Sequence, residues 1–207
     1  MRFKKLVLDF DHTLFDDGSF MESISSVFHK FGISRGDFEV SYEKTKLLHG
    51  SWNPFSQARL IFGDTPASFI KDMDSTFRRA HRHVFPDAKE FLSQSLTQNT
   101  ILSFGDEEAQ MLKIKNSKID RYFESIIITS DSLKTDFFAK QKIETLTTVF
   151  VDDRVKTVDA VKSAFPSVFC VLMKRPGSKF FEEPSVETLA DDTVTDFYEL
   201  QKIYEDY

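Results

Sequence analysis

The chain has 207 residues, a net charge of −6 and a hydrophobic fraction of 41%. This length holds one domain of ordinary size, or a core domain with an inserted subdomain, and the hydrophobic fraction supports a proper core. No apolar stretch is long enough to span a bilayer, and the negative charge argues against a general nucleic-acid binder. Cys170 is the only cysteine and lies in an apolar run. We expect a buried, inert thiol there and a reducing, cytoplasmic setting, since no intrachain disulfide can form.

The first predicted element is a strand that ends in two carboxylates. Leu6-Val7-Leu8 is a short apolar run typical of a strand buried on both faces of a parallel sheet. Asp9 and Asp11 follow it, and on an extended chain their side chains point to the same side. Such a pair is costly unless a cation or a shared proton relieves the repulsion, and carboxylate oxygens are ligands that Mg²⁺ prefers. The pattern indicates a metal site with one Asp as a nucleophile, while turn formation is the alternative for a single Asp after a strand.

The stretch from Ser19 to about Arg82 contains no convincing strand. Apolar residues recur at helical spacing from Phe20 to Phe31, and turn signals and capping residues delimit further helices. The predicted helices cover about 20–31, 35–48, 54–62 and 66–83. We interpret residues 16–83 as an all-helical subdomain that is inserted between two parts of a core, residues 1–15 and 84–207.

After a helix near residues 88–92, strands and helices alternate. The predicted strands are 101–104, 125–129, 148–151 and 168–173, and the predicted helices are 106–116, 135–141, 157–164 and 194–204. Strands separated by helices indicate an α/β fold in which helices cover both faces of a doubly wound parallel sheet. Ligands of such sheets bind beyond the carboxyl ends of the strands.

Each core strand before the last carries polar or charged residues at its carboxyl end. The residues concerned are Asp9 and Asp11, then Ser103 with Phe104, then Lys134, then Asp152 and Asp153. In this order they resemble the four motifs of the haloacid dehalogenase-like (HAD) hydrolase superfamily, specifically its magnesium-dependent phosphatases. The first motif, Asp-x-Asp-x-Thr, matches residues 9–13, and the place of the helical insertion resembles the cap of one large subgroup.

The resemblance implies a Rossmann-like core and a role for each of these residues. Asp9 would be the nucleophile that forms an aspartyl-phosphate, and Asp11 the general acid and base. The implied metal is Mg²⁺, bound by the side chains of Asp9 and Asp153, with Asp152 as a direct or indirect ligand and Asp11 contributing its backbone carbonyl. Three further residues would hold the phosphate and balance its charge: Ser103, Phe104 and Lys134.

The chain departs from the family pattern in two places that concern the site. His12 stands where the family often has Gly, and it either shapes the site, contacts the substrate or merely fills the loop. Thr135 replaces the proline that commonly follows the motif lysine, and the stretch from Lys134 to Asp152 is short. Lys140 is therefore the alternative to Lys134.

The predicted function is hydrolysis of a small phosphorylated metabolite by a magnesium-dependent phosphatase. The alternatives are a phosphomutase of the same superfamily and a catalytically silent binding protein with the same fold. Dehalogenation is disfavoured because it needs no leaving-group acid, and Asp11 is present. Candidates for substrate recognition in the cap are Trp52, Asn53, Arg59 and the basic cluster Arg78–His83, whose basic residues are also the one local feature that suits a nucleic acid. The natural substrate and the oligomeric state stay open.

Overall fold

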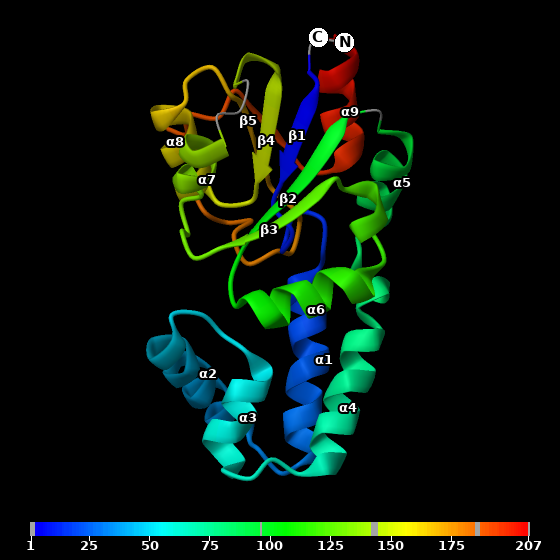
Figure 1. The fold of residues 1–207 in the computed structure, drawn as a ribbon, viewed down its shortest axis with the longest axis vertical. Coiled ribbons are helices and arrows are strands. Elements are labelled where there is room, and N and C mark those ends of the chain that lie inside the picture. The colour runs from blue at the N-terminus through cyan, green and yellow to red at the C-terminus, as the bar shows by residue number, and fades with distance from the viewer. Residues whose placement is uncertain (1–2, 96, 142–144, 185–186, 207) are drawn as a thin grey trace.

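The computed structural model describes residues 3–95, 97–141, 145–184 and 187–206. In this part of the chain six strands form one all-parallel sheet in the order β3-β2-β1-β4-β5-β6 (Figure 1). The strands are β1 (Lys5–Leu8), β2 (Gln98–Phe104), β3 (Ser125–Thr129), β4 (Thr148–Asp152), β5 (Phe169–Met173) and β6 (Asp192–Val194). The predicted α/β class is confirmed, with β6 as a strand that the sequence analysis missed.

The central strand β1 is buried on both sides, as its apolar run predicts. It pairs with β2 through Leu8 and Ile101 and with β4 through Leu8 and Val151. Leu6 and Leu8 pack into one hydrophobic cluster and Val7 packs into the other, because successive side chains of a strand point to opposite faces. The order of strands reverses between β1 and β4, which is the switch point where parallel sheets bind ligands.

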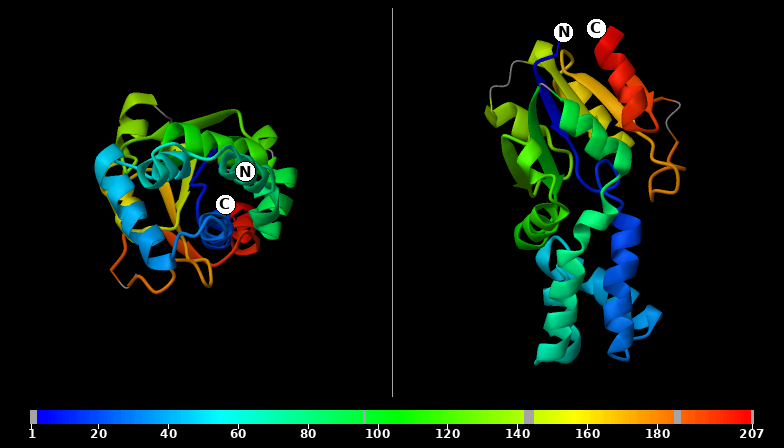
Figure 2. Two further views of the ribbon diagram at one scale, coloured as in Figure 1. Left: turned by 90° about the horizontal axis from the view of Figure 1, so that it is seen from below. Right: turned by 90° about the vertical axis from the view of Figure 1, so that its right-hand side faces the viewer.

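Helices cover both faces of the sheet (Figures 1 and 2). On one face lie α5 (Pro86–Gln94) and α9 (Phe197–Asp206), whose Phe91 and Phe197 rings are 5.1 Å apart. On the other lie α7 (Thr135–Gln141) and α8 (Val155–Ala164), and Phe138 of α7 meets Phe150 of β4 at 5.4 Å. Cys170 is buried in this second layer, and burial raises the pKa of its thiol to about 12. No helix in the described ranges is long and apolar enough to cross a membrane.

Four further helices extend beyond the carboxyl ends of the strands (Figure 1). They are α1 (Asp17–Lys30), α2 (Arg35–His49), α3 (Pro54–Phe62) and α4 (Ala67–Arg78). Side-chain caps begin three of them, because Asp16, Ser34 and Asn53 each accept a hydrogen bond from a backbone amide of the first turn. Phenylalanine rings form their core; Phe28, for example, lies 4.9 Å from Phe69.

The helix predicted to reach His83 ends earlier. It stops at Arg78, and a 3-10 turn, η1 (Ala80–His83), leads to α5. Helix α6 (Glu107–Ser117) lies between the sheet and the four helices and contacts both η1 and α4. Two other 3-10 turns, η2 (Asp120–Tyr122) and η3 (Thr145–Thr147), precede β3 and β4.

Candidate active site

Three buried carboxylates meet at the switch point of the sheet. Asp9 follows β1, Asp152 ends β4, and Asp153 is the next residue. The amide of Asp9 donates to the carbonyl of Val151 at 2.9 Å, so the pairing of the two strands continues to the cluster. One carboxylate oxygen from each of the three aspartates lies within 4.8 Å of the others. The structure thus brings together three of the four predicted metal-binding residues.

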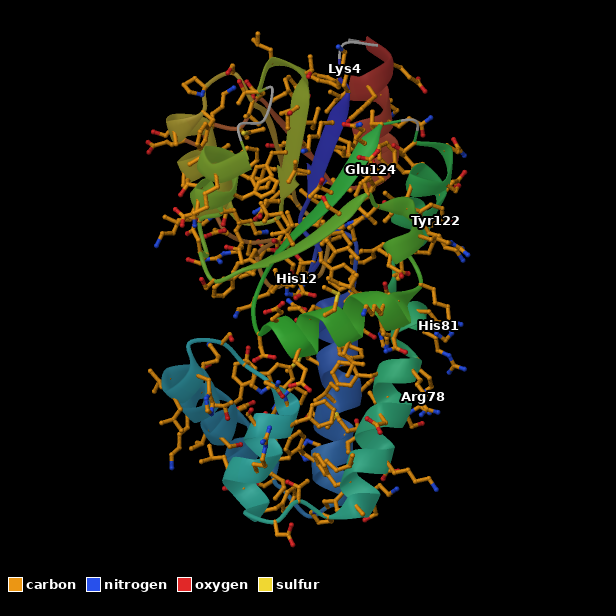
Figure 3. All side chains as sticks on the ribbon, viewed as in Figure 1. Lys4, His12, Arg78, His81, Tyr122 and Glu124 are labelled. Carbon is orange, nitrogen blue, oxygen red and sulfur yellow. The ribbon has the colours of Figure 1, made fainter. Side chains whose placement is uncertain are left out.

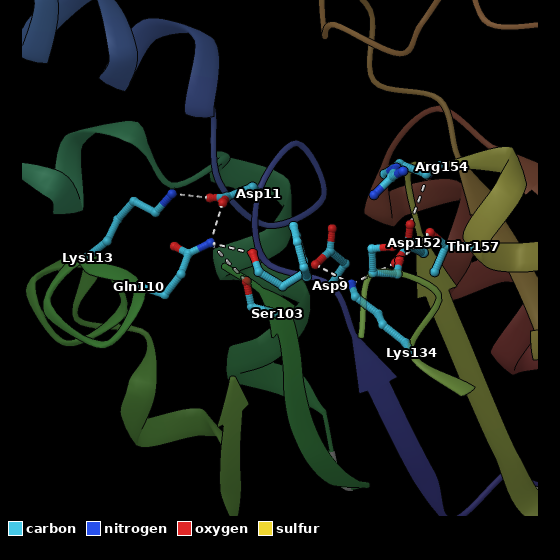
Figure 4. A network of polar contacts seen from close by, with 11 residues as sticks. Asp9, Asp11, Ser103, Gln110, Lys113, Lys134, Asp152, Arg154 and Thr157 are labelled. Carbon is cyan, nitrogen blue, oxygen red and sulfur yellow. Dashed lines mark hydrogen bonds and ion pairs between the residues drawn. The ribbon is translucent and has the colours of Figure 1, made fainter. Parts of the chain in front are cut away.

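Lys134 completes this cluster. Its Nζ donates to Asp9 Oδ1 at 2.5 Å and to Asp152 Oδ2 at 2.7 Å (Figure 4). Lys134 has a φ of +62°, an uncommon conformation for a residue with a side chain, immediately before α7. Lys140, the alternative from the sequence, lies on the surface and pairs with Asp136 at 3.0 Å. The fold therefore places Lys134, and not Lys140, beside Asp9, the candidate nucleophile.

Burial dominates the electrostatics of the cluster. Loss of water raises the pKa of Asp9 to about 6, although the Lys134 ammonium acts in the opposite direction. Burial likewise raises the pKa of Asp153 well above its usual range, and Asp9 adds to that shift. For Lys134, burial would lower the pKa, but Asp152 and Asp9 raise it above the ordinary value of a lysine. The group is a set of anions that a single ammonium does not neutralise.

The residues present fit a hard divalent cation. Asp153 Oδ2 is buried and has no hydrogen-bond partner among the described residues. The donor atoms offered are all carboxylate oxygens, the type that Mg²⁺ binds, and a divalent cation would relieve the repulsion that burial leaves. An unpaired buried carboxylate oxygen is costly on its own, which makes this atom the specific structural reason for expecting a cation here.

The carboxylate of Asp11 lies apart from this cluster, with partners that the sequence analysis did not identify (Figure 4). Lys113 Nζ is 2.6 Å from Asp11 Oδ1, and Gln110 Nε2 donates to Asp11 Oδ2 at 2.7 Å. The same ammonium lies 2.8 Å from Asp17 Oδ1 at the start of α1. Burial raises the pKa of Asp11, and Asp17 adds to the shift. Only the backbone carbonyl of Asp11, whose role stays a prediction, could serve as the expected metal ligand.

Gln110 also links Asp11 to the predicted phosphate-binding residues. Its Nε2 lies 3.2 Å from Ser103 Oγ and 3.1 Å from the carbonyl oxygen of Phe104. A Cβ atom at Gly105 would stand 2.9 Å from Gln110 Cγ, so the glycine makes this approach sterically feasible. Ser103 is buried at the end of β2, one strand away from Asp9. The structure therefore gathers every predicted catalytic and phosphate-binding residue at one edge of the sheet.

A cleft runs along this edge and has two chambers. The first, called the nucleophile chamber, has a volume of about 390 Å³ and contains Asp9, Ser103 and Lys134. The second, called the aromatic chamber, has a volume of about 180 Å³ and is walled by Phe20, Trp52 and other rings. Asp11, Asp17, Met21, Tyr42 and Phe104 line both chambers.

The remaining sequence candidates divide between this cleft and the outer surface. Trp52 lines the aromatic chamber, and Asn53 donates to Asp106 at 2.8 Å beside it. Arg59 lines a different hollow, with Asp64 and Glu108. The 78–83 cluster lines neither chamber; Figure 3 shows Arg78 and His81 at the outer edge.

His12 lies at the mouth of the nucleophile chamber. Its φ is +57°, a left-handed conformation that glycine adopts more easily, in agreement with the glycine found in the related motif. Its ring meets Phe180 edge-on at 5.8 Å, and its Nε2 lies 3.9 Å from Asp17 Oδ2. Thr13 is buried, and its carbonyl accepts two hydrogen bonds from Arg175.

Solved structures of known proteins have an architecture similar to that of this chain. A haloacid dehalogenase-like hydrolase of Burkholderia xenovorans LB400 superposes with a TM-score of 0.78 at 19% identity, covering 100% of this chain and 98% of that one. The chain has the haloacid dehalogenase-like fold. The HAD-hydrolase YfnB of Bacillus subtilis, whose structure was solved with bound magnesium, matches with a TM-score of 0.66 at 14% identity over 98% of this chain and 99% of that one.

Dehalogenases share the same fold. The L-2-haloacid dehalogenase of Xanthobacter autotrophicus matches with a TM-score of 0.67 at 18% identity and covers 98% of both chains. No protein-family model and no curated protein sequence matches this chain. Because these structural identities are below 20%, the likeness concerns the HAD fold, and the reaction has to be argued from the site.

Proposed function

We propose that the protein is a magnesium-dependent phosphomonoester hydrolase. The observation that carries the proposal is the buried cluster of Asp9, Asp152 and Asp153 with Lys134, which lies beside a second, separately held carboxylate, Asp11. Such a site offers a nucleophile, an excess of negative charge that suits a cation, and an acid for the leaving group. These are the parts that a two-step phosphoryl transfer requires.

In the first step, Asp9 attacks phosphorus, so that a bond from its carboxylate oxygen to phosphorus forms and the ester bond breaks. Asp11 gives a proton to the departing alcohol oxygen. In the second step, a water molecule attacks the aspartyl-phosphate, Asp11 takes the proton of that water, and inorganic phosphate leaves Asp9. Ser103 and the backbone of Phe104 hold phosphate oxygens, while Lys134 balances the charge spread over them.

The carboxylates of Asp9 and Asp153 would hold Mg²⁺, with Asp152 as a direct or indirect ligand and the Asp11 carbonyl as a further donor. Bound there, the cation would neutralise the carboxylates and polarise the phosphate. The unpaired Oδ2 of Asp153 supports this assignment from the protein side.

We propose that the helical segment, residues 16–83, acts as a cap over the cleft. Two contacts between α6 and this segment support the assignment: Lys113 with Asp17, and Asp106 with Asn53. A cap that closes the cleft would keep water from the first step and would contact the leaving group. The substrate is then a small phosphorylated metabolite, and the buried thiol of Cys170 agrees with a cytoplasmic location.

Dehalogenation is the competing reaction because dehalogenases are among the proteins with a similar fold. In that reaction a carboxylate displaces a halide from carbon, and the halide departs without a proton. Asp11, with its raised pKa and its own pair of partners, would then have no task. The presence of Asp11 in addition to Asp9 therefore favours phosphate esters over haloacids as substrates.

The test measures phosphate release from an aryl phosphate in parallel with halide release from a 2-haloacid. We expect release of inorganic phosphate that requires Mg²⁺, stops on chelation and is lost in Asp9→Asn. Asp136→Asn, which changes an exposed aspartate, is the matched control. Full activity of Asp9→Asn, or activity that ignores chelation, contradicts the proposal; halide release without phosphate release favours the dehalogenase. Transfer of phosphate between two positions of one sugar, with none released, favours the mutase.

A further inference from the structure

We propose that Arg154 and Lys179 form a second anion-binding subsite at the rim of the nucleophile chamber. The inference rests on the proposed phosphatase function and narrows its substrate class. The substrate would be a phosphomonoester whose leaving group carries a second negative charge, such as a carboxylate or another phosphate.

The first observation is that these two cations have no anionic side-chain partner among the described residues. Both line the nucleophile chamber, and neither makes an ion pair with any residue that the structure describes. The other lysines at the cleft do have such partners. Lys134 is held by Asp9 and Asp152, and Lys113 by Asp11 and Asp17. At the rim, therefore, the cleft has positive charges that are not paired with its own carboxylates.

The second observation is that one aromatic ring holds both cations at the cleft. The guanidinium carbon of Arg154 is 5.6 Å from the ring centre of Phe180, and Lys179 Nζ is 5.4 Å from it. Both distances are within the range of a cation–π contact. His12 meets the same ring at 5.8 Å. Phe180 thus brings the two cations together beside the loop that carries Asp11.

The loop that carries Lys179 and Phe180 is anchored on the core. The ammonium of Lys174, a largely buried residue, donates to the carbonyl oxygens of Phe180 at 2.9 Å and Glu183 at 2.6 Å. The carboxylate of Glu183 accepts from the amide of Val155, at the start of α8, at 3.3 Å. Arg154 directly precedes that helix. Both cations are therefore attached to the same anchored unit, which favours a built site over freely moving surface charges.

The inner part of the chamber cannot accept a second anion so easily. Asp9, Asp152 and Asp153 line it with negative charge, and Lys134 and the proposed cation already serve the reacting phosphate. In Figure 4, Arg154 and Lys134 lie on opposite sides of the acidic cluster. A guanidinium binds a carboxylate or phosphate through paired hydrogen bonds, and the adjacent ammonium adds charge. The reacting phosphate would lie at Asp9, and the second anion would extend toward the rim.

The test uses matched pairs of short alkyl phosphates that differ only in a terminal carboxylate or a terminal carboxamide. For the wild type we expect kcat/KM to be about tenfold higher for the carboxylate, the size typical of a charge-assisted contact. The ratio should fall toward one in Arg154→Gln/Lys179→Gln, and it should shrink at high salt. Lys156→Gln removes one positive charge from the exposed side of α8, outside the chamber, and should keep the ratio. A bisphosphate in place of the carboxylate distinguishes the two kinds of anion.

A ratio near one in the wild type, or one that the double variant leaves unchanged, overturns the subsite. An equal loss for both members of the pair also overturns it, because Arg154 would then bind the transferred phosphate. Binding of a phosphonate with a terminal carboxylate or carboxamide, measured by calorimetry, gives the same comparison without turnover. If no phosphate ester is hydrolysed, the proposed function fails, and these binding ratios still decide whether the anion subsite exists.

Discussion

Asp9, the proposed nucleophile, is a residue whose burial lowers the stability of the folded protein. Its carboxylate is buried close to those of Asp152 and Asp153, and its pKa is raised from 3.8 to about 6 by burial in spite of Lys134. Between these two pH values the folded protein keeps a proton that the unfolded chain has lost. The free energy of unfolding contributed by this residue therefore decreases as the pH rises from about 4 to about 6, and the loss persists above that range.

The first prediction concerns the metal-free protein. Asp9→Asn should increase the free energy of unfolding at pH 7.5 by about 3 kcal/mol, because it removes a buried charge whose pKa is raised. At pH 4, where Asp9 is protonated, the gain should be much smaller. Urea unfolding in the presence of a chelator measures both values. Asp136→Asn, at an exposed position, should change neither, and a stability loss for Asp9→Asn at both pH values would contradict the assigned pKa shift.

Residues of the candidate site differ in how well the sequence predicts their place in it. Asp9, Lys134 and Asp153 could be placed together because each follows an apolar strand or opens a helix, in the order of known motifs. Lys113 could not, because a single lysine in a helix normally faces solvent. Its burial results from tertiary contacts with Asp17 and with the rings of Phe15 and Phe20, at 5.5 and 5.9 Å, which no local pattern encodes.

At the level of elements, α6 is the link between the sheet edge and the helical segment. Asp106, Gln110 and Lys113 are spaced by four and three residues, so they share one face of the helix. Asp106 caps the helix and accepts from Asn53, Gln110 reaches Asp11 and Ser103, and Lys113 pairs with Asp11. Their 4-3 spacing places them on one face of the helix, but polar residues at this spacing are usual on solvent-exposed helix faces, so the sequence alone does not show that this face is buried.

The second prediction follows from the contact between α6 and Asp11. Lys113→Met should reduce kcat by about tenfold for alkyl phosphates, since a residue that positions the leaving-group acid affects the step in which that acid acts. Aryl phosphates, which leave without a proton, should lose much less. Lys113→Arg should recover part of the activity on alkyl phosphates. Lys115→Met, on the exposed side of the same helix, is the control, and an equal loss for both kinds of ester would show a purely structural role.

Elements were predicted from the sequence where local pattern and tertiary structure agree. The core strands have apolar runs, and α3 starts at Pro54 behind its capping residue Asn53, as predicted. Helix α1 begins at Asp17, three residues before the predicted start, because Asp16 caps it. Strand β6 was missed because Asp192-Thr193-Val194 is three residues long and largely exposed; its pairing with β5 is what makes it a strand. The break after Arg78 was missed because the residues of η1 continue a helical composition without glycine or proline.

At the scale of the molecule, the cleft is lined by residues of both the sheet edge and the helical segment. The sheet edge supplies the acidic cluster, while α1, α2 and the stretch before α3 supply much of the wall of the aromatic chamber. The divalent cation would bind only to groups of the sheet edge. Its effect on stability can therefore be measured separately from any contribution of the helical segment to substrate binding.

The third prediction concerns this cation. Mg²⁺ should raise the melting temperature at pH 8 more than at pH 5, because carboxylates must lose their protons to bind a metal and Asp9 retains its proton up to about pH 6. Thermal unfolding with and without Mg²⁺ at both pH values measures the difference. Asp153→Asn should abolish most of the stabilisation, and Asp136→Asn should retain it. Equal stabilisation at both pH values would place the cation elsewhere.

The position of β1 has a consequence for how the chain folds. This strand is made first, yet its two neighbours begin at residues 98 and 148. Leu6, Val7 and Leu8 therefore lack their first partner strand until about 90 further residues are made, and they lack the second until about 140 are made. Contacts so distant in sequence make folding slow, and unprotected apolar strands favour association between chains. The helices of residues 17–78, which contact one another locally, can form in the meantime. The edge that carries the cluster of Asp9, Asp152 and Asp153 is thus assembled late, when β4 joins β1.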